Sequence, residues 1–468
     1  MPSSLLPKQK CDQYAKQPDY KKYMTSRRNI LLTITILAFF LSAPLITLYT
    51  AGYRYNFKKN HLERVGFFET STVPANATTL IDGNIVGKTP YVDTGIFPGN
   101  YELKLSKDGY HAYNSRIEVR SGIASLLLNV LLFKDTNPEL VNQSPANAIL
   151  SKNGSYIAWI ESAAGVDTAM ISLTSGDKKR TVCALKPGTT QSVLWNDSGE
   201  SVLFLTKTSA GAEGCLTSVS GNTYALNDFF TEKIINVEWS PFDNNHLLIR
   251  AASGDYAVAF ERKEKKLASS ENVPFTIRGS RFFGVRSLKT GAELWSQSLS
   301  VLPINFGPEK IMLGIGDYTF LPSPEKYLVL KEARSGRIDV YDSKNFKRLN
   351  STVADSLVFD STGKSERFLA VSDFELTLVD LKAETSHLIV RYSEPITNVV
   401  WHPLEGHAIA YVNGEILAIP FENSAERTVH LAKFESTQSI WIDSRGDTLF
   451  IVGTSGAKSG VWKLVLKE

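Results

Sequence analysis

The stretch VLWNDSGESVLF, residues 193–204, decides the fold of most of this chain. Two apolar segments flank a short run of Asn, Asp, Ser and Gly, which are the residues that tight turns favour. Residues 202–204 are all apolar, as in a strand that is buried on both faces. The stretch therefore predicts two antiparallel strands joined by a tight turn.

The same pattern of strand, turn and buried strand recurs with a spacing of roughly 35 to 46 residues. Copies lie at residues 148–159, 193–204, 237–249, 319–330, 357–370, 399–410 and 440–451, and a degenerate copy runs through 282–285. This period suits a four-stranded sheet, and radially arranged sheets bury both of their faces. We therefore expect residues 146–468 to form a β-propeller. Eight blades of about 40 residues fit best, and seven of about 46 residues would also fit.

The repeated turn followed by an apolar strand resembles the TolB-like and WD-type propellers. In those families a Ser-Pro-Asp-Gly type turn precedes the buried strand. Trp195, Trp239 and Trp401 hold equivalent positions before the turn. We expect these side chains to pack between blades.

Residues 65–133 follow a different pattern, the period-two alternation of a half-buried sheet. Tyr101, Leu103 and Leu105 alternate with polar residues, and turn-forming dipeptides bracket the strand. The landmarks of this region are Pro74, Asp82, Gly83, Gly87, Thr89, Pro90, Pro98, Gly99, Tyr101, Gly109 and Tyr110. With these residues the segment resembles the PEGA domain, a small β-sandwich of bacterial and archaeal envelope proteins. The tetrapeptide that names the family is Pro-Ala-Asn-Ala here, at residues 74–77. A polar linker is expected at residues 134–145.

An uncharged apolar run extends from Ile30 to Ala51 and includes Pro44. As a helix it would be about 33 Å long, and the hydrocarbon core of a bilayer is about 30 Å thick. A signal-peptide cleavage site fits poorly at its end, because small residues are not suitably spaced there. We predict an uncleaved transmembrane signal anchor at residues 30–51.

Basic residues are concentrated before this run. Residues 1–29 contain seven of the 51 basic residues and two of the 48 acidic ones, which leaves 44 basic and 46 acidic residues elsewhere. The positive-inside rule then predicts a cytoplasmic tail at residues 1–29 and extracytoplasmic C-terminal domains in the cell membrane. The nearly neutral remainder lacks the basic surface that nucleic-acid binding requires, so no nucleic-acid partner is expected.

Known chemical motifs do not emerge from the sequence. Residues 83–89 mimic a phosphate-binding loop but are one residue short and continue as extended chain, so no nucleotide is expected. The seven histidines and three cysteines do not have metal-ligand spacing, so we predict no metal and no cofactor. A GxSxG elbow is absent, and we expect no catalytic residues and no enzymatic activity. Cys183 and Cys215 are consistent with either a disulfide or two buried thiols.

The expected function is that of a single-pass envelope protein that displays a PEGA-like module and a propeller as a scaffold for protein binding. Propeller loops vary freely on a rigid ring, so function depends on the surface they present. Binding of cell-wall or surface polysaccharide is the alternative, suggested by Tyr53, Tyr55 and Tyr113. A propeller hydrolase is the third reading, and it would need carboxylates gathered at the axis.

Overall fold

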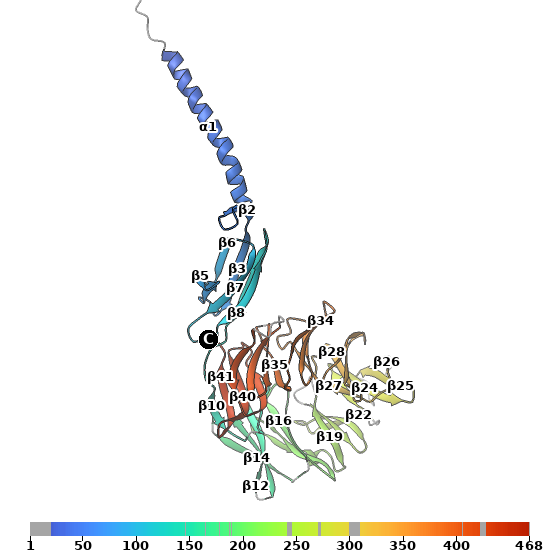
Figure 1. Cartoon of the computed structure of the whole chain (residues 1–468). Coiled ribbons are helices and arrows are strands. Elements are labelled where there is room, and N and C mark those ends of the chain that lie inside the picture. The colour runs from blue at the N-terminus through green and yellow to red at the C-terminus, as the bar shows by residue number, and fades with distance from the viewer. Residues whose placement is uncertain are drawn as a thin grey trace, which may run out of the picture. The chain divides into compact units, whose positions relative to one another are not determined.

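The structure is a computed structural model. It describes residues 20–467 except 146, 164, 177, 187, 189, 241–245, 270–272, 299–308, 405 and 422–426. The chain divides into two compact units, Met1–Leu103 with Arg116–Val130 and Lys104–Ser115 with Leu131–Glu468. Apart from α1 and a short 3-10 turn, the regular elements in the described part are strands (Figure 1). The chain is therefore mostly β, as predicted.

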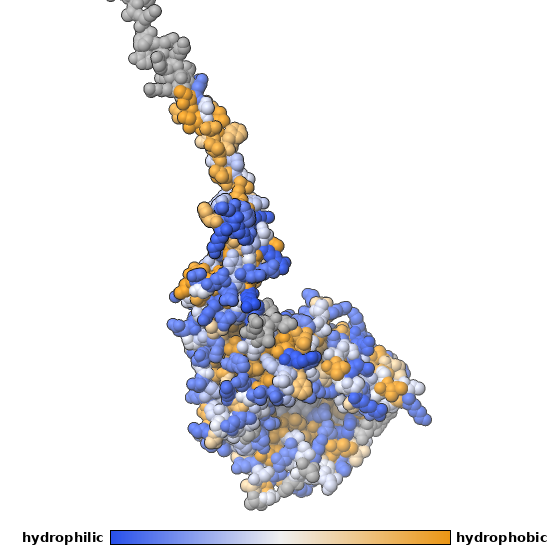
Figure 2. All heavy atoms as spheres, in the orientation of Figure 1, coloured by the Kyte–Doolittle hydropathy of each residue, from blue (hydrophilic) through white to orange (hydrophobic). Residues whose placement is uncertain are grey.

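Helix α1 extends from Tyr20 to Thr50 and contains Pro44. Its segment Arg28–Thr50 has a mean hydropathy of 2.3 and is not buried against protein. Figure 2 shows hydrophobic residues along the exposed surface of this helix. The hydroxyls of Thr35 and Thr47 donate to carbonyl oxygens one turn back, which satisfies these polar groups within the helix. The predicted span, residues 30–51, lies within this helix except for Ala51, which follows the helix end.

A two-stranded hairpin, β1 (Tyr53–Asn56) and β2 (His61–Arg64), follows the helix. Next come two sheets with the orders β6-β3-β9 and β5-β4-β7-β8. Their strands are β3 (Gly66–Val73), β4 (Thr78–Ile81), β5 (Asn84–Lys88), β6 (Tyr91–Ile96), β7 (Gly99–Ser106), β8 (Tyr113–Val119) and β9 (Ala124–Leu131). Burial alternates strictly along β3, and Phe68, Ala77 and Leu103 are fully or almost fully buried. The predicted small β-domain thus has its core between these sheets.

Eight four-stranded sheets account for the regular structure described after residue 138. In chain order, the first seven are β11 (Ile149–Leu150), β12 (Tyr156–Ala163), β13 (Val166–Leu173), β14 (Lys179–Leu185); β15 (Thr190–Trp195), β16 (Ser201–Thr208), β17 (Gly211–Ser218), β18 (Thr223–Ala225); β19 (Ile234–Trp239), β20 (His246–Ala251), β21 (Gly254–Ala259), β22 (Glu264–Ser269); β23 (Phe275–Arg278), β24 (Arg281–Leu288), β25 (Gly291–Ser298), β26 (Glu309–Leu313); β27 (Tyr318–Leu321), β28 (Tyr327–Glu332), β29 (Arg337–Asp342), β30 (Arg348–Val353); β31 (Ser356–Phe359), β32 (Arg367–Val371), β33 (Glu375–Asp380), β34 (Thr385–Arg391); and β35 (Ile396–Trp401), β36 (His407–Val412), β37 (Glu415–Pro420), β38 (Val429–Lys433). The 3-10 turn η1 (Leu226–Asp228) follows β18.

The eighth sheet joins both ends of the ring. It contains β39 (Ser436–Ile442), β40 (Thr448–Ser455) and β41 (Lys458–Val465), and its fourth strand is β10 (Glu139–Gln143), paired with β41. The linker expected at residues 134–145 is therefore wrong in part, because β10 lies within it. Without β10 the backbone edge of β41 would be unpaired, and a closed ring removes such an edge.

Hydrophobic clusters lie between neighbouring sheets of the ring. One cluster packs Ala158 and Ile160 of the first sheet against Val202 and Phe204 of the second. Another packs Ile157 of the first sheet against Val452 and Val461 of the eighth, which closes the ring. The first strands of neighbouring sheets contact one another, so they line the axis. Figure 1 shows these sheets arranged around a ring, and the eight-bladed prediction agrees with the eight sheets described.

Candidate interaction surface

The residues that resemble the PEGA pattern lie in strands and in the turns between them. Asp82 and Gly83 adopt positive φ angles of 48° and 77° in the turn between β4 and β5. Thr89 is buried, and its hydroxyl accepts a hydrogen bond from the Ala77 amide at 3.0 Å. The Tyr101 hydroxyl donates to the Phe97 carbonyl at 2.8 Å. These contacts hold the backbone of the small domain.

The backbone of the small domain and the segment after it also depends on Gly87, Gly109 and Tyr110. A Cβ atom on Gly87 would lie 2.8 Å from the Tyr91 ring, so only glycine fits there without displacing that ring. Gly109 has a φ of +76°, and its carbonyl accepts a hydrogen bond from the Asp135 amide at 2.9 Å. Tyr110 pairs with Lys134 in an isolated bridge. The loop-like motif at residues 83–89 is a turn followed by β5, with no helix N-terminus to hold a phosphate.

The three tryptophans that we expected to pack between blades do so, to different depths. Trp195 and Trp401 are buried, and Trp239 packs at the edge of a core cluster. The indole N–H groups of Trp195 and Trp239 donate to the carbonyls of Ile149 and Leu194 in the preceding sheets, at 3.0 and 2.7 Å. The indoles of Trp195 and Trp239 thus tie neighbouring blades together, whereas the Trp401 indole contributes through burial.

The ring has two faces that differ in the loops that form them. On one face lie the turns between the first and second strands of the sheets, and we call this the AB face. Neighbouring turns contact one another there: the Asn153 side chain donates to the Ser198 carbonyl at 2.8 Å, and Arg278 donates to the Ser323 hydroxyl at 3.0 Å. On the opposite face, the BC face, lie the hairpins between second and third strands and the connections between sheets.

Exposed apolar side chains gather on the BC face of the fourth to sixth sheets. They belong to hairpins, to connections and to the end of an outer strand, and they are Leu288, Met312, Ile315, Val353 and Phe374. Ile315 is 76% exposed and Val353 is 70% exposed. The described AB turns are mainly polar, with Leu404 as an exception at 41% exposure. Exposed apolar residues that cluster on one face indicate a binding surface.

A cleft of about 250 Å³ opens on the BC face between the sixth and seventh sheets. Asp355 and Asp373 lie at its rim, and Val358, Val371 and Val399 are among the residues that line it. Lys331 contacts the Asp355 carboxylate at 3.7 Å, whereas the Asp373 carboxylate has no partner among the described residues. Val353 and Phe374 are close to the two acidic residues along the chain. The cleft therefore combines negative charge with apolar walls.

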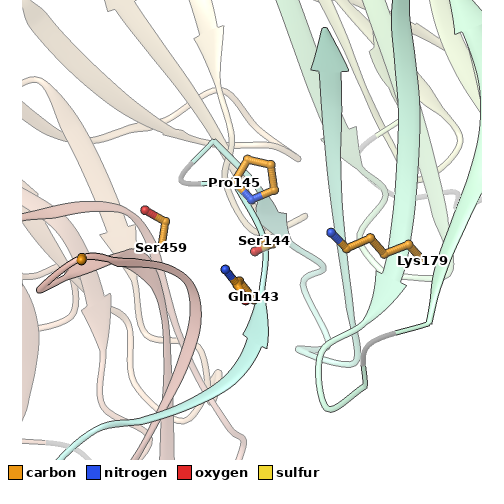
Figure 3. Close-up of a pocket in the computed structure, with 6 residues that line it drawn as sticks. Gln143, Ser144, Pro145, Lys179 and Ser459 are labelled. Atoms are coloured by element: carbon orange, nitrogen blue, oxygen red, sulfur yellow. The ribbon is translucent and has the colours of Figure 1, made fainter. Parts of the chain in front are cut away.

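A larger cavity of about 610 Å³ lies between the eighth and first sheets. It is lined by Gln143, Ser144, Pro145, Lys179, Ala457 and Ser459. Figure 3 shows Lys179 extending from the first sheet toward Ser144 and Pro145. The cavity is polar, and among the described residues that line it Lys179 alone is charged. The residues that line it do not include an activated nucleophile or a pair of catalytic carboxylates.

Four buried carboxylates near the starts of third strands were not identified from the sequence. They lie near the start of the third strand in the first, third, fourth and fifth sheets and are Asp167, Asp255, Glu293 and Asp339. Each one has a polar or basic partner: Gln191 at 2.7 Å, Arg250 at 3.0 Å, Arg286 at 2.7 Å and Arg337 at 3.1 Å. Burial raises the pKa of Asp255, and the salt bridges to Lys310 and Arg286 lower that of Glu293. Because each carboxylate has its own partner, we infer that these carboxylates stabilise the local structure near the BC hairpins.

Two histidines, buried His402 and partly buried His407, lie beside the chain segment that enters the propeller. The rings of His402 and His407 pack edge-on against Phe133, with centroids 5.8 and 5.2 Å away. Burial lowers the pKa of His402 to about 4 and that of His407 to about 3. The His402 Nδ1 accepts a hydrogen bond from the Leu404 amide at 3.2 Å. Among the described residues, no group of three His, Cys, Asp or Glu could hold a metal ion.

The structure joins Cys183 of β14 to Cys215 of β17 by a disulfide, with Cα atoms 6.7 Å apart. The bond connects the outer strand of the first sheet to the second sheet. Cys215 is buried. Cys11 lies outside the described residues.

Comparison with known proteins identifies the small domain. The model of the PEGA domain matches residues 69–128. Over these residues the chain is similar to the PEGA domain family. The match ends inside β9, and the propeller follows it in the chain. No curated protein matches the chain.

Solved structures similar to the chain include several propellers. The propeller domain of Cps50 (Swd1) from Myceliophteria thermophila is 14% identical, with 59% of this chain and 96% of that chain covered and a TM-score of 0.39. The Dos1 propeller is 12% identical, with 71% and 93% covered and a TM-score of 0.45. Sqt1 of Saccharomyces cerevisiae is 10% identical, with 72% and 98% covered and a TM-score of 0.44.

Proposed function

We propose that this protein is a single-pass, membrane-anchored scaffold without catalytic activity, whose propeller binds another envelope protein through its BC face. The observation that carries the proposal is the concentration of exposed apolar residues on that face of the fourth to sixth sheets. The AB face is occupied by polar turns that bond to one another, so it offers little apolar area to a partner. A rigid ring with one apolar face suits protein docking.

The anchor and its orientation are part of this proposal. The exposed apolar helix Arg28–Thr50 is long enough to cross a bilayer. The disulfide between Cys183 and Cys215 suits an oxidising compartment outside the cytoplasm. The disulfide and the basic residues before the helix together favour a cytoplasmic N-terminus and an extracytoplasmic PEGA domain and propeller.

The acidic cleft suggests what the partner presents. The Asp373 carboxylate has no ion-pair or hydrogen-bond partner among the described residues, and the cleft walls beside it are apolar. A lysine or arginine side chain can place its aliphatic stem against apolar walls and its charge beside a carboxylate. We therefore propose that the partner inserts a basic residue flanked by apolar residues.

Photo-crosslinking in intact cells tests the docking face. A photoreactive amino acid would replace Phe374, which is 44% exposed on the BC face, or Leu404, which is 41% exposed on the AB face. We expect a discrete crosslinked protein from position 374 and none from position 404. Equal crosslinking at both positions, or none at 374, would contradict the proposal.

The charge requirement is tested on the crosslinked partner. We expect Asp373→Asn to weaken binding roughly threefold to tenfold at low salt, because a rim charge acts mainly on association. A variant Glu261→Gln is the control, because Glu261 is exposed in the turn between β21 and β22, at the opposite end of the strands from the BC face. Sedimentation with purified cell-wall polymer, in the absence of other proteins, would instead favour the polysaccharide alternative.

A further inference from the structure

The hairpin β1–β2 follows the apolar helix at once. Helix α1 ends at Thr50, and β1 begins at Tyr53. The Val65 amide, just after β2, donates to the Gly52 carbonyl at 2.9 Å. The Arg54 guanidinium donates to the Tyr49 carbonyl at 2.7 Å and lies 3.5 Å from the centre of the Tyr49 ring. The base of the hairpin is therefore tied to the end of the helix.

The two faces of this hairpin differ in chemistry. Tyr53 pairs with Arg64 and Tyr55 pairs with Leu62, so all four side chains project from one face. Tyr53, Tyr55 and Leu62 are 38%, 46% and 52% exposed. On this face the exposed side chains are thus mainly aromatic and aliphatic.

The aromatic face continues into the turn. Phe57 is 85% exposed, and its ring contacts that of Tyr55 with centroids 5.0 Å apart. An isolated two-stranded hairpin is marginally stable in water and does not ordinarily leave such residues bare. The exposed aromatic face therefore lacks a partner among the described residues.

The opposite face is polar and already satisfied. The Asn56 side chain is buried and donates to the Glu63 carboxylate at 2.9 Å. Lys59 pairs with the same carboxylate at 3.0 Å, and these bonds lower the pKa of Glu63. The hairpin is therefore amphipathic, with an organised polar face and a bare apolar one.

The position of the hairpin limits what can cover this face. A four-residue strand is about 13 Å long, and each headgroup layer of a bilayer is roughly 5–8 Å thick. If α1 spans the bilayer, a hairpin that starts three residues later can lie flat within the headgroup layer. Tyrosine side chains are enriched at that depth, with apolar rings toward the lipid tails.

We propose that the aromatic face of β1–β2, made of Tyr53, Tyr55, Phe57 and Leu62, lies in the lipid headgroup layer and binds the membrane surface. The inference rests on the proposed membrane anchor. Lys58 at the turn is exposed and supplies positive charge, which anionic headgroups attract. The hairpin then fixes the helix end at the membrane surface, and tyrosines that suggested polysaccharide binding serve the membrane contact.

The test uses the full-length chain in liposomes of phosphatidylethanolamine and phosphatidylglycerol. Single cysteines are introduced by Leu62→Cys on the aromatic face or His61→Cys on the polar face, in a Cys11→Ser background, and labelled with an environment-sensitive fluorophore. The two positions are adjacent in the chain and lie on opposite faces of one hairpin. A third label at Val353→Cys reports a propeller residue that is 70% exposed.

Some quenchers can be attached to shallow positions of the lipid chains. We expect them to quench the label at position 62 several-fold more than the labels at positions 61 and 353. Aqueous iodide should show the reverse order. Equal quenching at positions 61 and 62 would overturn the inference. If the full-length chain does not float with the liposomes, the proposed anchor itself fails, so the two failures are distinguishable.

The composition of the liposomes separates the apolar contact from the charged one. Liposomes of phosphatidylcholine alone lack net negative charge. We expect the label at position 62 to remain shallowly immersed in them, because aromatic burial does not require anionic lipid. Loss of immersion in these neutral liposomes would overturn the aromatic contact as its basis.

Discussion

At the scale of single residues, two turn glycines distinguish the requirement for a positive φ angle from the requirement for space around the backbone. Gly154 and Gly363 lie in equivalent AB turns with φ angles of +70° and +66°. A Cβ atom on Gly154 would lie 2.3 Å from the Trp441 ring, whereas a Cβ atom on Gly363 would meet nothing within 4 Å. The two positions share a strained backbone and differ in the space around them.

Substitution by alanine should reveal this difference. We expect Gly363→Ala to lower the free energy of unfolding of the propeller by about 1 kcal/mol through backbone strain alone. Gly154→Ala should lower it by about 2–4 kcal/mol, because the Trp441 ring must also move. All seven tryptophans lie in the propeller, so tryptophan fluorescence during urea unfolding reports this domain. Equal losses would contradict the packing role of Trp441.

The burial of His402 makes the stability of the propeller depend on pH. The pKa of His402 is about 4 when folded, below the value of about 6.5 for an exposed imidazole. Below pH 6.5 the unfolded chain takes up a proton that the folded chain refuses, so the free energy of unfolding falls as the pH falls toward 4. The slope for one such histidine is at most about 1.4 kcal/mol per pH unit.

Replacement of His402 tests this dependence. We expect His402→Asn to reduce the slope of stability against pH between 6.5 and 5, since one proton uptake is removed. His61→Asn is the control, because this histidine lies in β2, outside the propeller whose unfolding is measured. An unchanged slope in the His402 variant would mean that this ring accepts a proton in the folded state.

At the scale of elements, the strands that close structures are the ones that sequence patterns miss. Strand β10 has only five residues and lies in a polar segment, and its partner β41 is more than 300 residues away in the chain. The disulfide has the same character, since it connects strands of two sheets. Neither the pairing of β10 nor the bond between Cys183 and Cys215 follows from local periodicity.

The disulfide should contribute to the stability of the propeller. It encloses a loop with a sequence separation of 32 residues, for which loop-closure entropy gives about 3–4 kcal/mol. We expect a reducing agent to lower the urea midpoint of the wild-type propeller. The double variant Cys183→Ser/Cys215→Ser should already have the lower midpoint and should not respond to the reducing agent. A wild-type midpoint insensitive to reduction would contradict the bond.

At the scale of the whole molecule, the anchor decides where every other part acts. We expect the full-length chain to stay in the membrane fraction after alkaline carbonate extraction, and a chain without residues 1–51 to be soluble. The intact mass should include the N-terminal segment, because the helix is not cleaved. A mature protein that begins after residue 51 would instead identify the helix as a signal sequence.

The sequence alone was enough to predict the repeated strands of the propeller and the apolar helix. The turn-and-strand pattern of residues 193–204 recurs often enough to predict a propeller, because turn chemistry and burial are local properties. The PEGA landmarks were recognised for the same reason, since positions such as Asp82 and Gly83 set local turns. The fourth blade was weak in sequence because a short turn at Gly279 replaces the usual Asp-rich one.

Only the tertiary structure decided which residues share a surface. Val353, Phe374 and the two cleft aspartates come from separate loops, and the ring brings these loops to one face. The two faces of the β1–β2 hairpin likewise depend on strand pairing. The closing strand β10 and the disulfide follow from contacts between distant segments. Local patterns determine each element because they depend on near neighbours, whereas surfaces and closures depend on how the elements pack.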